Sequence, residues 1–228
     1  MSMTAVAARI ATRFTVAFAL AAAVIACAVV QPSEAEQTKA PATARSEVDV
    51  QIVAKGLEHP WGLAFLPDGR MLVTQKGGSM RILSSDGKSI LATVSGIPAV
   101  ASSGQGGLLD VALDPDFAID PWVYWTYAEP GPGPEAGLAG TAVARGRLNG
   151  TAMQDVAVIY RQVPKVSGGG HFGSRLAFRA DKTLFVTLGE RQLGSPAQDL
   201  ATTLGKVVRI NRDGTIPLDN PAIPGARP

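Results

Sequence analysis

Short runs of apolar, β-prone residues recur along the chain from about residue 50 onward, and a turn signal separates each run from the next. The two clearest copies align without a gap at an offset of 113 residues: Leu63–Phe65, Asp68 and Met71–Thr74 in the first, Leu176–Phe178, Asp181 and Leu184–Thr187 in the second. Runs of this kind, bounded by Asp, Gly and Pro, are typical of two antiparallel strands joined by a tight turn. The pattern therefore predicts a strand pair at both places.

A third copy lies between these two, with Val111–Leu113 before Pro115 and Trp122–Trp125 after it. A closing β-prone run also recurs, as Arg81–Leu83 before one Asp-Gly pair and as Arg209–Asn211 before another. Each copy predicts a small antiparallel sheet, which cannot bury both of its faces alone.

Repeated sheets of this size bury their faces by packing against one another, as the blades of a β-propeller do. The copies begin 48 and then 65 residues apart, which brackets the usual length of a blade with loop insertions. No stretch shows sustained helical periodicity, so the sequence predicts an all-β fold. An ordinary β-sandwich with chance internal similarity is the alternative. Residues 48–228 hold only about three blades, so we expect the chain to be part of a longer propeller.

The first 35 residues are of a different kind. Arg9 and Arg13 precede the uncharged apolar run Phe14–Val30, and small residues follow it. This arrangement is typical of a secretory signal peptide, so we expect cleavage after Ala35, a flexible linker over residues 36–47, and a periplasmic or secreted product without a stable membrane span. A membrane anchor is one alternative, although 17 residues is at the lower limit for a span. A lipoprotein attached through Cys27 is the other.

Only two histidines are present, which narrows the search for a general base. His59 precedes the first predicted strand beside a proline, where a structural role is the usual one. His171 follows three glycines and precedes another strand, so the backbone there is free to approach a ligand closely. A histidine at the mouth of a strand suits a base that works near neutral pH. On these residues alone, catalytic and structural roles for His171 both remain open.

Gln105 lies among glycines in the loop before Val111, at the place in its repeat that His171 holds in the next one. Two loops of neighbouring blades would then face one pocket, whereas a plain turn is the alternative. Glu190 and Arg191 follow the apolar run of the last copy. Charged residues in that place belong either to a site at the end of the strand or to a solvated rim.

Several other patterns exclude functions. Gly168, Gly170 and Gly173 satisfy G-x-G-x-x-G but lead into a strand rather than a helix, which excludes a dinucleotide site. Asn149-Gly150 is typical of a hairpin turn. The chain has no G-x-S-x-G nucleophile motif, no P-loop and no Cys/His metal spacing. A formal net charge of +2 offers no basic stripe for nucleic acid, and a single cysteine excludes an intrachain disulfide.

Four stretches of the chain resemble the soluble aldose sugar dehydrogenases that depend on pyrroloquinoline quinone (PQQ), also called the glucose/sorbosone dehydrogenase family. They occur in order from about residue 50 to the end of the chain, and together they are specific, although each alone is weak. The stretches are Gly56–Gly69, Gly104–Phe117, His171–Leu176 and Gly205–Gly214.

This resemblance implies a six-bladed propeller with PQQ over its central channel, calcium as a second cofactor, and an external electron acceptor. It implies oxidation of an aldose sugar at the anomeric carbon to the lactone. His171, in the motif H-x-G-x-R-L, would take the hydroxyl proton while a hydride passes to the quinone. The resemblance assigns Gln105, Arg175 and Glu190 to the cofactor and substrate site, with Glu190 where relatives usually carry Asp.

Two departures from the family pattern matter. Gly170 precedes His171 where relatives place Asn or Asp, so a polar group that helps to orient the base or the sugar is absent. The family's basic residues that hold PQQ, and most of its calcium ligands, belong to later blades, so this chain alone is expected to be inactive or to bind no cofactor. The alternatives are a calcium-dependent propeller lactonase and a propeller that serves as a non-catalytic binding scaffold.

Overall fold

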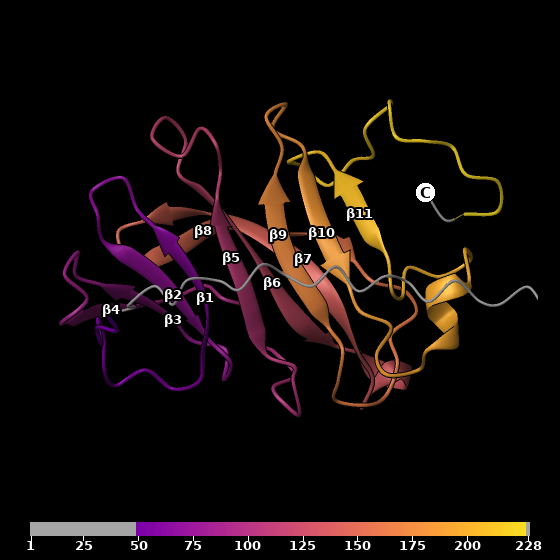
Figure 1. Ribbon diagram of the computed structural model, residues 1–228, viewed down its shortest axis with the longest axis horizontal. Helices are drawn as coiled ribbons and strands as arrows, with labels where there is room; N and C mark the ends of the chain where they lie inside the picture. The colour runs from indigo at the N-terminus through magenta and orange to yellow at the C-terminus, as the bar shows by residue number, and fades with distance from the viewer. Residues whose placement is uncertain (1–48, 227–228) are drawn as a thin grey trace, which may run out of the picture. The chain divides into compact units, whose positions relative to one another are not determined.

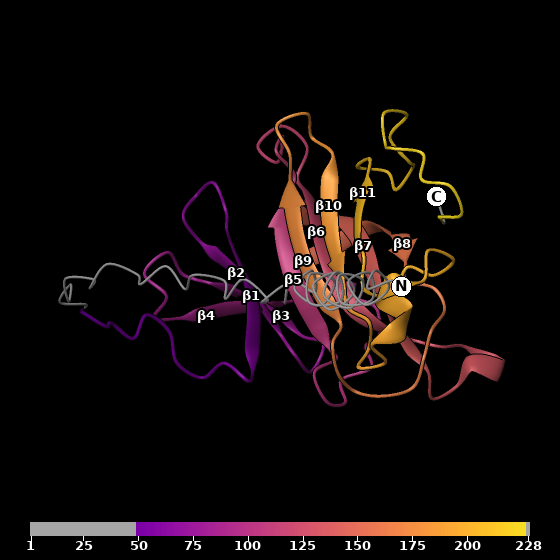
Figure 2. The ribbon, with the colours of Figure 1, turned by 45° about the vertical axis from the view of Figure 1, so that its right-hand side comes forward.

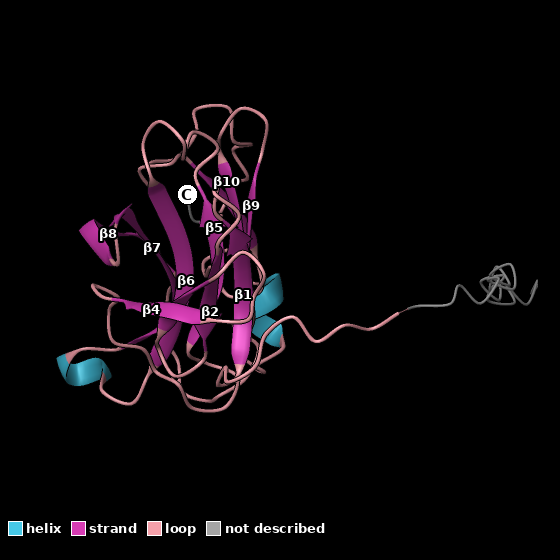
Figure 3. Ribbon diagram, turned by 90° about the vertical axis from the view of Figure 1, so that its left-hand side faces the viewer, coloured by secondary structure: helices cyan, strands magenta, loops and turns pink. Residues whose placement is uncertain are grey.

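The computed structural model describes residues 49–226, and the eleven strands of that range form three antiparallel sheets (Figure 1). The predicted signal peptide, the linker and Cys27 lie outside the described residues. Two short 3₁₀ turns, η1 (Gly133–Glu135) and η2 (Ser195–Gln198), are the helical elements of the described range (Figure 3). Neither approaches the length or the apolar character that a helix needs to cross a membrane. The all-β prediction is therefore confirmed.

Each sheet is a meander in which neighbours in sequence pair in space, and each contains one copy of the repeat. The first sheet is β1 (Pro60–Phe65), β2 (Met71–Gln75), β3 (Met80–Leu83) and β4 (Ile90–Val94); the second is β5 (Leu108–Leu113), β6 (Trp122–Pro130), β7 (Ala139–Asn149) and β8 (Ala152–Arg161); the third is β9 (Gly173–Phe178), β10 (Leu184–Leu188) and β11 (Val207–Ile210). The runs predicted from the sequence fall in β1–β3, β5, β6 and β9–β11. Strands β4, β7 and β8 were not predicted, although Asn149-Gly150 does turn between β7 and β8 as expected.

The second sheet packs between the other two, and its side chains alternate between the two interfaces (Figure 2). Trp125 of β6 is buried against Leu72 and Ile82 of the first sheet. Its neighbour Tyr124 points the other way and is buried against Leu176 and Val186 of the third. Because successive side chains of a strand face opposite sides, one strand supplies two cores. Two interfaces in series are what the blade prediction requires, and they exclude a two-sheet sandwich.

Threonines on the second strand of each sheet fasten that sheet to the next. Thr126 of β6 accepts a hydrogen bond from the backbone N–H of Asp110 in its own sheet, at 2.9 Å. It donates to the carbonyl of Ser174 on β9 of the third sheet, at 2.8 Å. Thr74 of β2 accepts from Gly62 and donates to the Leu109 carbonyl of the second sheet in the same way. The first strands β1, β5 and β9 are thereby held next to one another, and so are the loops that precede them.

Candidate functional site

The loops before β5 and β9 approach each other so closely that only glycine fits between them. A Cβ on Gly104 would lie 2.3 Å from the carbonyl oxygen of Gly169, well inside van der Waals contact. The N–H of Gln105 donates to that same carbonyl at 2.6 Å. Glycine is therefore required where the second and third sheets meet at this end.

Gln105 and His171, which the repeat predicts at equivalent places, are in direct contact. The side-chain Oε1 of Gln105 accepts the backbone N–H of His171 at 2.8 Å. His171 has a φ of 48°, a left-handed conformation that is uncommon for residues other than glycine. Gln105 thus satisfies the backbone of His171 at the point where that backbone makes its unusual turn into β9.

Glu190 holds the imidazole ring of His171 from the opposite side. Its Oε1 lies 2.5 Å from Nδ1 of the ring, and the side chains are 23% and 49% exposed. The hydrogen bond from His171 lowers the pKa of the Glu190 carboxyl, so that group is ionised at neutral pH and accepts the bond. Nδ1 then carries the proton, which leaves Nε2 with a free lone pair. Glu190 belongs to the site rather than to a solvated rim.

Arg175 lies further along β9 and joins a different set of contacts. Its guanidinium donates to Asp110 of β5 at 3.1 Å and lies 5.4 Å from the ring centroid of Trp61 on β1. The Asp110 carboxylate is 3% exposed, and it also accepts the N–H of Leu176 at 2.8 Å. The Arg175 side chain remains 66% exposed. Gln105, His171 and Glu190 therefore form one cluster, and Arg175 spans the three first strands beside it.

Two residues of the site have roles that the sequence did not predict. Arg191 is 2% exposed, so it is buried and does not lie on a solvated rim. Gln192 occupies the space next to Gly170, where a Cβ would lie 2.3 Å from the Gln192 amide. The missing polar side chain at position 170 is thus replaced in space by an amide from two residues past Glu190. The sequence carried no signal for this, because both contacts depend on how the loop folds.

His59 occupies the corresponding place before β1 with nearly the same backbone conformation. Its φ is 49°, and its carbonyl accepts the N–H of Lys76 at 3.0 Å, as the carbonyl of His171 accepts the N–H of Arg191 at 3.3 Å. The hydrogen bond recorded for His59 is made by its backbone, whereas His171 also engages its ring. The structural role predicted for His59 agrees with this difference.

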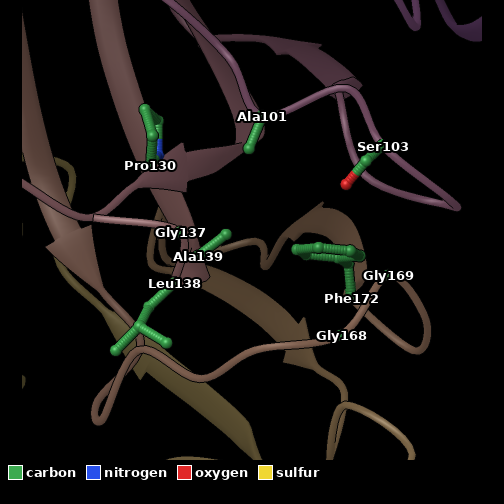
Figure 4. A pocket seen from close by; sticks show the side chains of 9 residues that line it. All are labelled: Ala101, Ser103, Pro130, Gly137, Leu138, Ala139, Gly168, Gly169 and Phe172. Carbon is green, nitrogen blue, oxygen red and sulfur yellow. The ribbon is translucent and has the colours of Figure 1, made fainter. Parts of the chain in front are cut away.

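A pocket of about 390 Å³ borders the cluster (Figure 4). It is lined by Gly168 and Gly169 of the glycine loop and by the ring of Phe172, together with Ser103 and Leu138. The side chains of Gln105, His171 and Glu190 are not part of its wall. Metal-binding side chains are scarce as well: within residues 49–226, no three His, Cys, Asp or Glu residues gather closely enough to hold an ion. The charged and polar groups therefore face open space beside the pocket.

Residues 57–228 match the model of the family described as Glucose / Sorbosone dehydrogenase. Among curated proteins, the chain is 47% identical over 187 residues to the aldose sugar dehydrogenase YliI of Escherichia coli, a match that covers 81% of this chain and 48% of that protein. It is 28% identical to the quinoprotein glucose dehydrogenase B of Acinetobacter calcoaceticus, over 81% and 44% of the two chains. The chain spans about half the length of the curated relatives it matches.

Solved structures give the same result. The apo form of the soluble aldose sugar dehydrogenase from Escherichia coli superposes with a TM-score of 0.73 at 45% identity, over 78% of this chain and 51% of that one. The PQQ-bound form of an aldose sugar dehydrogenase from Streptomyces coelicolor superposes with a TM-score of 0.67 at 31% identity, over the same shares. The three sheets thus have the arrangement of blades in these dehydrogenases.

Proposed function

The chain belongs to the glucose/sorbosone dehydrogenase family, and from that membership we propose that the protein oxidises aldose sugars at the anomeric carbon, giving the lactone, with PQQ as cofactor. The observation that carries the proposal is the contact between Glu190 and the imidazole of His171. It leaves a half-exposed ring nitrogen free to take a proton, at the junction of two blades.

His171 is the proposed base. Its Nε2 takes the proton of the anomeric hydroxyl, and the positive charge that develops on the ring is balanced by the ionised Glu190 at Nδ1. Gln105 fixes the backbone of His171, so that the ring has a defined starting point. When bound, PQQ supplies the acceptor for the hydride that leaves the anomeric carbon, so the sugar loses one proton and one hydride and becomes the lactone.

The donors beside His171 fit a flat anionic cofactor such as PQQ. The exposed guanidinium of Arg175 offers planar N–H groups, which suit carboxylates, and it lies near the aromatic face of Trp61. The glycines at the loop junction carry no side chains that would obstruct a planar ring. We assign Arg175, Gln105 and Glu190 to the binding of cofactor and substrate on these grounds.

The remaining parts of the proposal come from the resemblance. Calcium is the proposed second cofactor, and no step is derived through it, because the resemblance places most of its ligands in later blades. The electrons pass on to an external acceptor. A periplasmic or secreted location rests on the predicted signal peptide.

The test is performed on the complete gene product, incubated with PQQ and calcium and assayed with a panel of aldoses and a dye as electron acceptor. We expect dye reduction that requires both PQQ and sugar, one lactone for each pair of electrons, and slower turnover with an aldose deuterated at C1. Lactone hydrolysis without dye reduction would favour a lactonase instead. Failure to bind PQQ at all would favour a non-catalytic scaffold.

A further inference from the structure

Arg191 is a buried cation whose hydrogen-bond acceptors are all backbone carbonyls. Its Nε donates to Gly170 at 2.9 Å, its Nη1 to Ala139 at 2.6 Å, and its Nη2 to Gly168. Its Cζ lies 3.6 Å from the ring centroid of Phe172. The ion pairs recorded between residues 49 and 226 do not include Arg191. Burial accordingly lowers the pKa of its guanidinium, because no carboxylate compensates the lost water.

Burying a cation without a carboxylate is unfavourable, so the contacts that it makes need a reason beyond packing. Two of its three acceptors, Gly168 and Gly170, belong to the glycine loop directly before His171. These residues have no side chains to anchor them, and Gly168 has a φ of 94°. A planar guanidinium with several donors can fix two carbonyls of such a loop and a third on β7 at the same time. Arg191 therefore supplies the rigidity that the glycines lack.

The other two blades show that the fold itself does not require an arginine here. In each blade a backbone N–H at the end of the second strand donates to the residue before the first strand: Lys76 to His59, Ala128 to Gly107, and Arg191 to His171. Lysine and alanine fill this position equally well in the first two blades. Arginine is used only beside the histidine whose ring is engaged by Glu190. Its side chain thus acts on the loop of this one blade.

We propose that Arg191 is a positioning residue for His171, holding the glycine loop so that the imidazole stays where Glu190 and Gln105 direct it. The inference rests on the proposed function, in which His171 is the base. Glu190 then orients the ring through Nδ1, and the next residue in sequence orients the chain that carries the ring. Neither contact requires Arg191 to touch the sugar or the cofactor.

The kinetic test compares Arg191→Lys and Arg191→Met in the PQQ-loaded complete gene product. A displacement of about 1 Å reduces turnover by about 100-fold, so we expect that loss in kcat for methionine and about a tenfold loss for lysine, which keeps the charge but not the fork. The KM for the sugar should change by no more than about twofold. In a His171→Ala background, Arg191→Lys should reduce the residual rate no further, because the group it positions is gone.

Arg145 provides the matched control. It also donates to a backbone carbonyl, that of Arg212 at 2.8 Å, and it lies 4.3 Å from the ring centroid of Trp122, away from the site. Arg145→Lys should therefore leave kcat unchanged even if it lowers stability. An equal loss of kcat in Arg145→Lys and Arg191→Lys would overturn the proposal.

A second readout needs neither cofactor nor turnover, so it separates this proposal from the proposed function. The histidine Cε1–H resonances of the cofactor-free protein are recorded by NMR, and that of His171 is assigned by its loss in His171→Gln. Arg191→Lys should broaden or split the His171 resonance and leave that of His59 in place. An unchanged His171 resonance in a folded Arg191→Lys protein would overturn the proposal, whether or not the protein oxidises sugars.

Discussion

Replacing Thr126 with valine tests whether its hydroxyl holds the second and third sheets together. The side chain is fully buried, as are its two partners, the N–H of Asp110 and the carbonyl of Ser174. Valine has nearly the same shape but satisfies neither group. An unsatisfied buried polar group costs about 1–3 kcal/mol, and burying the added methyl returns about 0.8 kcal/mol. The expected loss of unfolding free energy is about 3 kcal/mol.

The repeat supplies an internal comparison for this value. Thr74→Val should cost about as much as Thr126→Val, because Thr74 also bridges two sheets. The Thr187 hydroxyl is partly exposed, and its one recorded bond among the described residues is from the N–H of Arg175 in its own sheet. Its replacement should therefore cost about 1 kcal/mol or less. Thr202→Val, which removes only contacts of 3.4 Å, should stay within about 0.5 kcal/mol.

Urea unfolding, followed by intrinsic tryptophan fluorescence, measures these differences. At a typical m-value, about 3 kcal/mol lowers the midpoint by ~1 M urea without changing the slope. A midpoint for Thr126→Val that coincides with that of Thr202→Val would refute the reasoning. So would a loss for Thr187→Val as large as that for Thr126→Val, because the effect would then not come from the bond between sheets.

Two further predictions concern the cluster around His171. Glu190→Gln should lower kcat by about 10- to 100-fold, because the amide cannot balance the charge that develops on the ring. Because the folded-state pKa of Glu190 lies below its usual 4.5, its stabilising contribution is complete above that pH and is lost as the pH falls through the depressed value; the stability difference between wild type and Glu190→Gln in acid titrations should disappear there, and a difference that grows toward low pH would contradict the assignment. Gly170→Asn should displace the Gln192 side chain and cost less than about 1 kcal/mol, and nothing further in a Gln192→Ala background, as measured by urea unfolding; a loss above about 2 kcal/mol in both backgrounds would show that backbone, not Gln192, fills that space.

The strands that the sequence predicted are those whose pattern is local. β-Prone runs on either side of Asp-Gly or Pro-Asp turns gave the first strands of each blade, and Asn149-Gly150 marked a hairpin whose strands themselves were missed. β7 is Ala139–Asn149, a strand of small residues, glycines and arginines, and it is buried only because two other sheets cover it. Its hydrophobicity is supplied by its neighbours, which no window along the chain contains.

The site divides in the same way. Gln105 and His171 were predicted together because the repeat placed them at equivalent positions, and a repeat preserves positions in space. The sequence left Glu190 open between a site and a rim, and its contact with Nδ1 decides between them. The burial of Arg191 was not predictable, because a charged residue after a strand is normally solvated. Its acceptors are backbone carbonyls, which every sequence contains, so only the folded loop shows why an arginine is there.

The most direct test of the central claim compares the two histidines of the chain as alanine variants in the PQQ-loaded complete gene product. Both residues precede a first strand with nearly the same φ, so the substitutions impose a similar change on the backbone. The account predicts that His171→Ala lowers the rate of sugar-dependent dye reduction by about 100- to 10,000-fold, as loss of a general base does, and that His59→Ala changes it by no more than about twofold. Equal rates in the two variants, or a His171→Ala protein as fast as wild type, would contradict the claim that His171 is the base.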